Sequence, residues 1–330
     1  MTSHPEFGKK TTCEDVVEAF ADVVKGKTIV ITGVSPNGLG EAMAKALATK
    51  SPANLIFTAL SVSKAESVAN DIKHLHPSLN IQILQLDLSS LKSVRVATAT
   101  LLKLVSTSID ILINNAGVMA IPDRTLSKDG YEMHFATNFL GHFLFANLLV
   151  SNNKIAQNAR IVNVTSGGYM VCPIRFHDLA WEGDKELPAE EEPDMAIAEQ
   201  LKIPKLASTG QYSPMLAYLH SNTASMLFSV GLAKRFQEKG VVGISTAPGV
   251  VVTELQRYIG GFRNPIMEYK TASQGAASFL VAALDPALQG HGGAYIDDCQ
   301  IADVVVDHAK SERIADRLWN IAEEMTGAKF

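Results

Sequence analysis

The sequence contains few cysteines and no long apolar run, and both absences narrow the class of protein. Only three cysteines, Cys13, Cys172 and Cys299, occur among 330 residues. Their odd number and wide spacing exclude a disulfide framework and suit a reducing compartment. No run of about 18 apolar residues exists, which excludes a membrane-spanning helix, and the first residues lack the basic start and apolar block of a secretory signal. We therefore expect a cytoplasmic protein without a membrane partner.

Strong charge of either sign is also missing. Lysine and arginine number 29 against 34 acidic residues, a net charge of −5, which excludes a general nucleic-acid-binding surface. Hydrophobic residues make up 47% of the chain and are enough for a sizeable core. We predict a small-molecule substrate, no nucleic-acid partner and no metal site.

Apolar runs alternate with amphipathic stretches along most of the chain. The pattern predicts helices at 39–49, 63–75, 91–104 and 135–149, and strands at 28–32, 54–59, 81–86, 109–113, 160–164 and 241–246. Strands separated by helices of this length imply right-handed crossovers and a parallel sheet covered on both faces. The predicted fold class is therefore α/β, a doubly wound parallel sheet (Rossmann fold) in a single domain.

Two segments interrupt this alternation. Residues 1–25 form an N-terminal extension with an amphipathic helix at about 13–24, and the main domain is expected to span 26–330. Within it, residues 167–211 lack a clear period and carry an acidic centre. A stretch this long without regular structure is usually functional, and we interpret it as an insertion on the substrate side.

The first predicted strand runs into a glycine-rich turn that opens a helix. Glycines allow a pyrophosphate to approach the backbone, and the helix N-terminus supplies free N–H groups and a positive dipole end. A strand before this turn and a helix after it favour a dinucleotide site over a simple tight turn. The segment reads Thr-Gly-Val-Ser-Pro-Asn-Gly-Leu-Gly over residues 32–40.

This turn and the motifs that follow it resemble the short-chain dehydrogenase/reductase family. The sequence Asn-Asn-Ala-Gly follows the fourth predicted strand, Asn-Val-Thr-Ser lies on the fifth, and Pro-Gly follows the sixth. The end of the chain, at 293–300, 318–319 and 327–330, is similar to retinol-dehydrogenase-like reductases of fungal type. The matching segments are 32–40, 114–117, Asn138, 163–166, Tyr218 and 248–253.

The resemblance implies a role for each matching residue. Ser166 would hydrogen-bond the substrate oxygen, Tyr218 would exchange its proton as general acid or base, and Asn138 would anchor a proton-relay water. Asp87 would accept from the adenine amino group, and Thr253 would contact the nicotinamide carboxamide or the phosphates. The cofactor-binding set is Gly33, Ser35, Asn37, Gly38, Leu39, Gly40, Ser61, Lys64, Asp87, Leu88, Asn115, Ala116, Gly117, Pro248, Gly249, Val251 and Thr253.

Two departures concern the cofactor. Four residues separate Gly33 from Gly38, one more than the family pattern, and Ser35 and Asn37 in this longer loop are added donors. The second strand ends without the acidic residue that reads a ribose 2′-hydroxyl or the arginine that reads a 2′-phosphate. Ser61 and Lys64 suit a phosphate there, so we predict NADP, with NAD as the alternative.

The third departure concerns the active site. The family pattern Tyr-x-x-x-Lys reads Tyr218-Leu-His-Ser-Asn222 in this chain. The lysine would hold the nicotinamide ribose and lower the pKa of the tyrosine, whereas asparagine supplies no charge. His220 is two residues from Tyr218 and therefore on another face of the helix. Lys202, Lys205 and Arg175 in the insertion are candidate replacement cations.

Two functions remain open at this stage. A neutral phenol is already a competent proton donor, so the first is NAD(P)H-dependent reduction of a carbonyl in a bulky, mostly apolar metabolite of secondary metabolism, with Asn138, Ser166, Tyr218 and Asn222 at the site. The alternative is a protein of this fold without ordinary redox activity. It would be an isomerase, dehydratase or cyclase that uses the Ser166–Tyr218 pair, or a nucleotide-binding interaction protein. The resemblance also implies a homodimer through the helix that carries Tyr218, where residues 227–236 offer apolar side chains.

Overall fold

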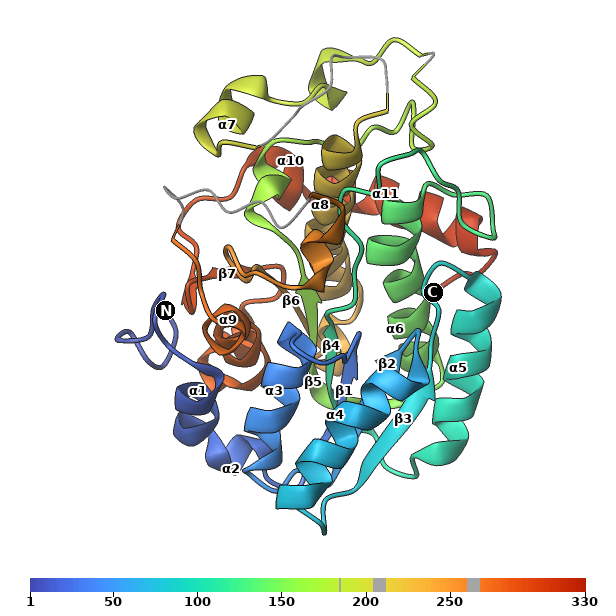
Figure 1. Ribbon diagram of the computed structural model, residues 1–330. Coiled ribbons are helices and arrows are strands. Elements are labelled where there is room, and N and C mark those ends of the chain that lie inside the picture. The colour runs from blue at the N-terminus through green and yellow to red at the C-terminus, as the bar shows by residue number, and fades with distance from the viewer. Residues whose placement is uncertain (184, 204–211, 260–267) are drawn as a thin grey trace.

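A mostly parallel sheet forms the centre of the described chain, with helices on both of its faces (Figure 1). The computed structural model describes residues 1–183, 185–203, 212–259 and 268–330. In the described residues the sheet has eight strands in the order β3-β2-β1-β4-β5-β6-β7-β8. All pairs are parallel except β7 with β8. The order reverses direction between β1 and β4, as the predicted doubly wound Rossmann fold requires, and the fold class is confirmed.

The bounds of the elements are as follows. The strands are β1 (Thr28–Thr32), β2 (Asn54–Ala59), β3 (Ile81–Gln85), β4 (Ile109–Asn114), β5 (Ile155–Val164), β6 (Val242–Thr246), β7 (Tyr295–Asp297) and β8 (Gln300–Ile301). The α-helices are α1 (Cys13–Ala19), α2 (Ala21–Val24), α3 (Leu39–Ala48), α4 (Val62–Leu75), α5 (Leu91–Leu104), α6 (Gly141–Ser151), α7 (Met195–Gln200), α8 (Pro214–Arg235), α9 (Ala272–Leu284), α10 (Asp307–Lys310) and α11 (Glu312–Thr326). The other helical turns are η1 (Phe135–Leu140), η2 (Gly167–Met170), η3 (Ala189–Glu191), η4 (Gln237–Lys239), η5 (Glu254–Ile259) and η6 (Pro286–Gly290).

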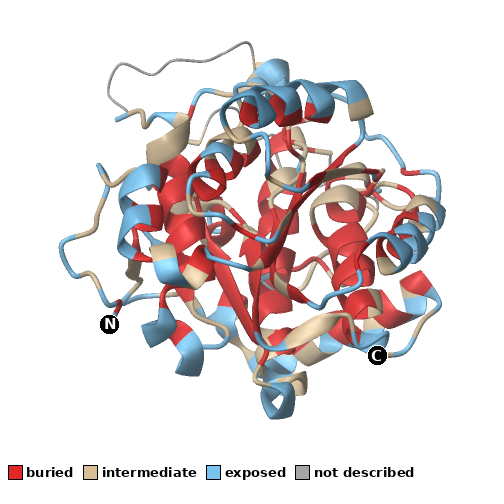
Figure 2. Ribbon diagram, turned by 90° about the horizontal axis from the view of Figure 1, so that it is seen from below, coloured by how far each residue is buried: buried red, intermediate tan, exposed pale blue. Residues whose placement is uncertain are grey.

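Strand periodicity divides the core between the two faces of the sheet. Ile29 and Ile31 of β1 belong to one buried cluster with α1, α3, α4 and α9. Val30, between them, belongs to a second cluster with α5, α6, α8 and α11. Successive side chains of a strand point to opposite faces, so a continuous apolar run is required where helices cover both. Figure 2 shows this burial along the strands and the inner sides of the helices.

The observed elements follow the expected ranges closely, with three differences. β5 begins at Ile155, five residues before the expected start at 160. The short hairpin of β7 and β8 has three and two residues, too few for a periodic signal. The insertion at 167–211, which we expected to lack regular structure, contains η2, η3 and α7 in its described part.

Both ends of the chain pack against the main fold. α1 begins at a capping box of Thr12 and Asp15 and lies against α9 and α3. At the other end α11 lies along α8, where Trp319 packs edge-to-face on Phe143. Leu227 and Phe228, two of the apolar side chains expected at a dimer surface, are buried in this core. The homodimer stays a prediction.

Neither a membrane span nor a metal site is found in the described ranges. None of the helices there combines the length and apolar character that crossing a bilayer requires. No group of three or more histidine, cysteine, aspartate or glutamate side chains in those ranges could hold a metal ion.

Candidate active site

The turn after β1 has the geometry of a phosphate-binding loop. Gly33 has a φ of +73°, and a Cβ at this position would lie 2.7 Å from the Cα of Ala116. Any other residue would therefore be strained and would collide with backbone. Gly38 caps α3 without a side-chain hydrogen bond to the first N–H groups of this helix, and the N–H of Asn37 just before it donates to Glu41 Oε2 at 2.6 Å. Free N–H groups at a helix start favour an anion.

Thr32 joins this loop to the turn after β4. Its Oγ1 accepts hydrogen bonds from the backbone N–H groups of Asn115 and Ala116, both at 2.9 Å. The side-chain amide of Asn115 donates to the backbone oxygen of Thr32 at 2.8 Å. The predicted cofactor residues of both turns therefore meet at the carboxyl ends of β1 and β4.

A buried histidine, which sequence reasoning missed, extends this connection to Asn138. The Nε2 atom of His142 lies 2.9 Å from Thr32 Oγ1, and its Nδ1 lies 3.1 Å from the backbone oxygen of Asn138. Burial lowers the pKa of His142 to about 4, so the imidazole is neutral and able to both donate and accept. The position four residues after Asn138 in an apolar helix was the available signal.

Asn138 lies in η1, a π-helical turn, and such turns occur frequently at functional sites. Its Oδ1 accepts from the N–H of Val118 at 2.8 Å, and its Nδ2 donates to Ser221 Oγ at 2.9 Å. Its backbone oxygen also accepts from Ser225 Oγ at 3.3 Å. Asn138 thus holds η1, the turn after β4 and α8 together.

Tyr218 lies in the first turns of α8, beside the end of β5. Ser213 caps this helix with its side chain and Pro214 begins it. Burial raises the pKa of Tyr218, and hydrogen bonds with the side chains of Asn222 and Ser166 offset this only in part. Within the described ranges, no cation contributes to this shift. The hydroxyl of Tyr218 is therefore protonated near neutral pH.

Asn222 is directed back onto its own helix. Its Nδ2 donates to the backbone oxygen of Tyr218 at 2.8 Å, and its backbone oxygen accepts from Thr165 Oγ1 at 3.0 Å. Ser166, the residue after Thr165, accepts a 3.3 Å hydrogen bond from Gly168 N–H. β5 and α8 thus bring the predicted catalytic residues Ser166, Tyr218 and Asn222 together.

Neither Arg175 nor Lys202 takes the place of the lysine. Arg175 is buried, forms a 2.6 Å ion pair with Asp178 and stacks over Trp181. Lys202 is exposed, and Lys205 lies outside the described residues. His220 is fully buried against Trp181 and Phe135, and burial lowers its pKa to about 3. It therefore supplies no positive charge near neutral pH.

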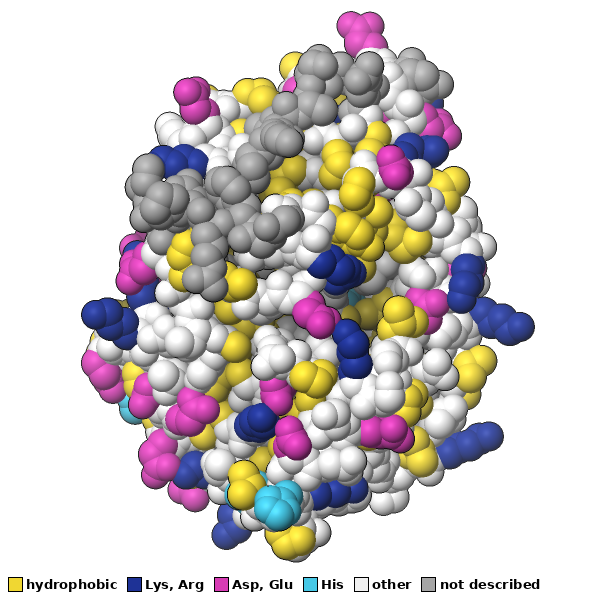
Figure 3. Space-filling view, viewed as in Figure 1, with side chains coloured by type: hydrophobic (Ala, Val, Ile, Leu, Met, Phe, Trp, Pro, Cys, Tyr) yellow, Lys and Arg dark blue, Asp and Glu magenta, His cyan; other side chains and the backbone are white. Residues whose placement is uncertain are grey.

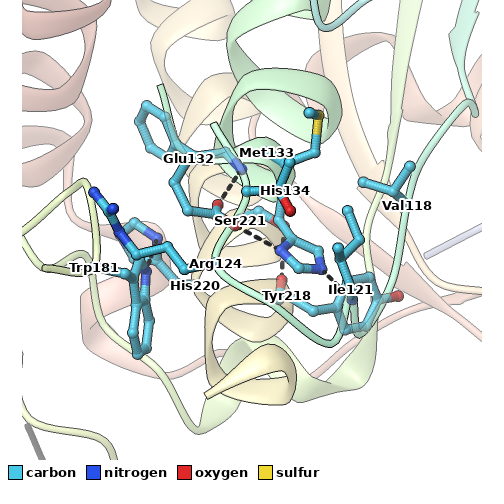
Figure 4. A network of polar contacts seen from close by, with 12 residues as sticks. Val118, Ile121, Arg124, Glu132, Met133, His134, Trp181, Tyr218, His220 and Ser221 are labelled. Atoms are coloured by element: carbon cyan, nitrogen blue, oxygen red, sulfur yellow. Dashed lines mark hydrogen bonds and ion pairs between the residues drawn. The ribbon is translucent and has the colours of Figure 1, made fainter. Parts of the chain in front are cut away.

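One wall of the site is fixed by a network that Figure 4 shows from close by. Ala120 has a φ of +51°, an uncommon conformation for a residue with a side chain. Both backbone groups of the next residue are held: Ile121 N–H donates to His134 Nε2, and Ile121 oxygen accepts from Tyr212 Oη, each at 3.2 Å. His134 is held in turn by the buried carboxylate of Glu132 at 2.7 Å.

Apolar side chains surround the ring of Tyr218. They come from the turn after β4, from the insertion, from the start of α8 and from η5. Val171 and Met215 belong to this cluster, whereas Tyr169 of the insertion packs elsewhere, against Tyr295. The cluster includes Met119, Ala120, Val171, Cys172, Trp181, Met215, Leu216 and Leu219, with Ile197, Leu255 and Ile259 packed against it.

Two ion pairs involve residues predicted to bind the ribose and adenine of the cofactor. Lys64, in the first turn of α4, contacts the carboxylate of Glu254 at 2.8 Å. Asp87 accepts hydrogen bonds from Ser89 and lies 3.2 Å from the ammonium of Lys128. Burial alone would raise the pKa of Asp87, but these partners outweigh it and lower the pKa. Figure 3 shows basic and acidic side chains interspersed across the middle of this face.

The turn after β6 lies beside the glycine-rich loop. Gly249 has a φ of +70°, and a Cβ on Gly275 of α9 would meet both Val251 and Leu39. The Pro-Gly turn therefore lies against the glycine-rich loop. Thr253 accepts from the N–H of Leu255 at 3.2 Å.

Comparisons with known proteins agree on one family. The family model described as short chain dehydrogenase matches residues 27–173. The chain is 39% identical over 247 residues to "Oxidoreductase fscI" of Fusarium equiseti, covering 74% of this chain and 94% of that protein. It is 34% identical over 313 residues to mouse "Retinol dehydrogenase 12", covering 93% and 88%.

Solved structures show the same fold at lower identity. A short-chain dehydrogenase/reductase from Serratia marcescens superposes with a TM-score of 0.60 at 20% identity, covering 83% of this chain and 96% of that one. The NADPH-bound carbonyl reductase from chicken fatty liver has a TM-score of 0.59 at 18% identity, covering 84% and 99%.

Proposed function

The chain belongs to the short-chain dehydrogenase/reductase family, and on this basis we propose that it reduces the carbonyl group of a bulky, mostly apolar metabolite. Family membership makes it an enzyme of NAD(P)-dependent carbonyl or alcohol redox chemistry. The direction of the reaction, the substrate class and the residue roles are our proposal.

The position of Tyr218, beside Asn222 and Ser166 with no cation among the described groups that shift its pKa, carries the proposal. Burial raises its pKa, and Asn222 provides a hydrogen bond but no positive charge. Alcohol oxidation needs this group as a base, and a phenolate is scarce without a cation. Carbonyl reduction needs it as an acid, which the neutral phenol already is.

The proposed division of roles follows from the positions of the side chains. A nicotinamide cofactor held by the Gly33–Gly40 loop would supply the hydride that the carbonyl carbon receives. Ser166 donates a hydrogen bond to the carbonyl oxygen, and Tyr218 gives that oxygen its proton as negative charge develops. Asn138 keeps η1 and α8 in register through Ser221. Asn222 orients the first turns of α8.

We propose NADP as the preferred cofactor, with NAD as the alternative. The Gly33–Gly40 loop would hold the pyrophosphate, and Asn115 and Gly117 would line the adenine ribose. β2 ends in Ala59, and no carboxylate follows it to accept from a 2′-hydroxyl. Ser61 and Lys64 lie at the start of α4 instead, where a 2′-phosphate would be attracted.

The apolar cluster around Tyr218 supports a bulky apolar substrate. We propose that residues 119–122, the insertion at 167–211 and the region after Pro248 form its walls. Relatives named retinol dehydrogenases make retinal a reasonable first probe. A cytoplasmic location, a place in secondary metabolism and a homodimer stay predictions.

The test is NADPH consumption with retinal and with a panel of apolar ketones. We expect turnover by the wild type and a loss of about 10²- to 10⁴-fold in kcat for Tyr218→Phe. Ser166→Ala should lower kcat as well, and both variants should bind NADPH as the wild type does. Conversion of a substrate without NADPH consumption would favour the non-redox alternative, and equal rates for wild type and Tyr218→Phe would contradict the role of Tyr218 as proton donor.

A further inference from the structure

The ion pair between Lys64 and Glu254 joins two rims of the cofactor crevice. Lys64 follows β2, whose carboxyl end faces the adenine ribose in folds of this type. Glu254 begins η5, directly after the turn that follows β6. The two residues are 190 positions apart, yet Nζ and Oε2 are separated by only 2.8 Å. The contact therefore depends on the fold and on the closeness of these two rims.

Lys64 carries its positive charge at the start of α4, where the helix dipole disfavours a cation, so a nearby anion stabilises it. The first turn of this helix contains no acidic residue, and a lysine at a helix N-terminus opposes the helix dipole. Ser61 occupies the N-cap position without bonding to the helix backbone, and its hydroxyl lies 3.1 Å from that of Ser63. The first residues of this helix thus supply two hydroxyls and an ammonium group where the helix dipole favours negative charge, and the carboxylate of Glu254 contacts the ammonium group.

We propose that Glu254 is a cofactor-selectivity residue, because its carboxylate competes with a cofactor 2′-phosphate for Lys64. This inference rests on the NADP preference proposed above. The contact is exchangeable, since the side chains of Lys64 and Glu254 are 50% and 65% exposed. Arg257 does not replace Lys64 as the carboxylate's partner, because it donates to the backbone oxygen of Glu254 at 3.0 Å and lies over the ring of Tyr258.

The preference of the wild type for NADPH over NADH would then be weaker than the preference that Lys64 would give without a carboxylate partner. A 2′-phosphate must separate Lys64 from Glu254 before it gains the same ammonium group. A ribose with a free 2′-hydroxyl leaves the ion pair intact. Glu254 therefore reduces the affinity for NADPH and leaves that for NADH nearly unchanged.

The experiment measures the dissociation constants of NADPH and NADH by fluorescence titration at low salt. Exposed ion pairs are weak, so we expect Glu254→Gln to bind NADPH about two- to fivefold more tightly, with NADH unchanged. The gain should shrink as salt is raised. Lys64→Gln should weaken NADPH alone, and adding Glu254→Gln to it should give no further gain.

A matched control is Asp316→Asn, which removes an exposed ion-pair partner of Lys234 and Arg235 between α11 and α8. It should leave both dissociation constants unchanged. Weaker binding of both cofactors by Glu254→Gln would overturn the inference, because it would make the pair a clamp over the bound cofactor. An unchanged NADPH affinity in Glu254→Gln would overturn it as well. If Lys64→Gln leaves the ratio of NADPH to NADH affinity unchanged, the NADP preference itself fails, which is a separate result.

Discussion

Replacing Asn222 with lysine tests the chemistry of the site most directly. The substitution restores the cation of the family pattern four residues after Tyr218. A positive charge there stabilises the phenolate and so lowers the pKa of Tyr218, against the effect of burial. We expect alcohol oxidation to increase strongly and carbonyl reduction to change little, because the phenol is already protonated in the wild type.

The size of the effect follows from the helix geometry. Side chains at i and i+4 are about 5–6 Å apart, and a unit charge about 5 Å away contributes roughly 3 kcal/mol at an effective dielectric constant of ~20. This corresponds to a fall of about two pKa units. Asn222 is only 4% exposed, so desolvation of the new ammonium group cancels part of the gain. We therefore expect oxidation at pH 8 to rise by roughly 10- to 100-fold.

The assay is the pH dependence of kcat/KM in both directions. For Asn222→Lys, the alkaline limb of the reduction profile should move to lower pH by about one to two units. Asn222→Met has nearly the length of lysine without its charge and is the matched control. It also removes the hydrogen bond that partly offsets the raised pKa of Tyr218, so its alkaline limb should not move to lower pH. If Asn222→Lys leaves oxidation and the alkaline limb unchanged, another group already supplies the charge, and the argument from the missing lysine is refuted.

Three further predictions concern stability and folding. Gly33→Ala should lower the free energy of unfolding by about 1–3 kcal/mol in urea titrations and abolish cofactor binding, because its Cβ would lie 2.7 Å from Ala116 Cα at a φ of +73°. Trp319→Ala should lower it by about 3–5 kcal/mol, since this side chain is buried between α11 and α8, whereas Val304→Ala at an exposed position should not change the Tm. Burial lowers the pKa of His220 from 6.5 to about 3, so the unfolded chain binds the proton first and stability falls as pH drops from about 6.5 towards 3. His220→Phe should flatten that acid slope, and an unchanged slope would show that other groups cause it.

Local sequence patterns predicted the centre of the fold well. β1 and β2 have the expected bounds, because strands buried on both faces are continuous apolar runs between turn residues. In helices such as α5, the apolar residues recur every three to four positions and lie on one face of the helix. The predicted site residues also come together, because turns at the carboxyl ends of neighbouring parallel strands must meet. β7 and β8 could not be predicted in the same way, since strands of three and two residues are too short to show a period, and β7 joins the sheet through β6, which is distant in sequence.

Contacts between distant residues explain most of what sequence reasoning missed. The link from His142 to Thr32 spans 110 positions, and no local signal marks either residue as a partner of the other. Arg175 is a different case, because its partner Asp178 is only three residues away. The i to i+3 spacing was a signal that this arginine was already paired and not free to replace a lysine.

The hydrogen bonds that hold the backbone of Ile121 also have a consequence for changing the substrate range of the enzyme. His134 and Tyr212 fix its N–H and its carbonyl oxygen, and the residue before it is already in a left-handed conformation. A backbone held in this way has few alternative positions, so mutations there should cost stability before they enlarge the pocket. Leu255 and Ile259, which pack against the same apolar cluster from the short helical turn η5, are the better positions at which to introduce diversity.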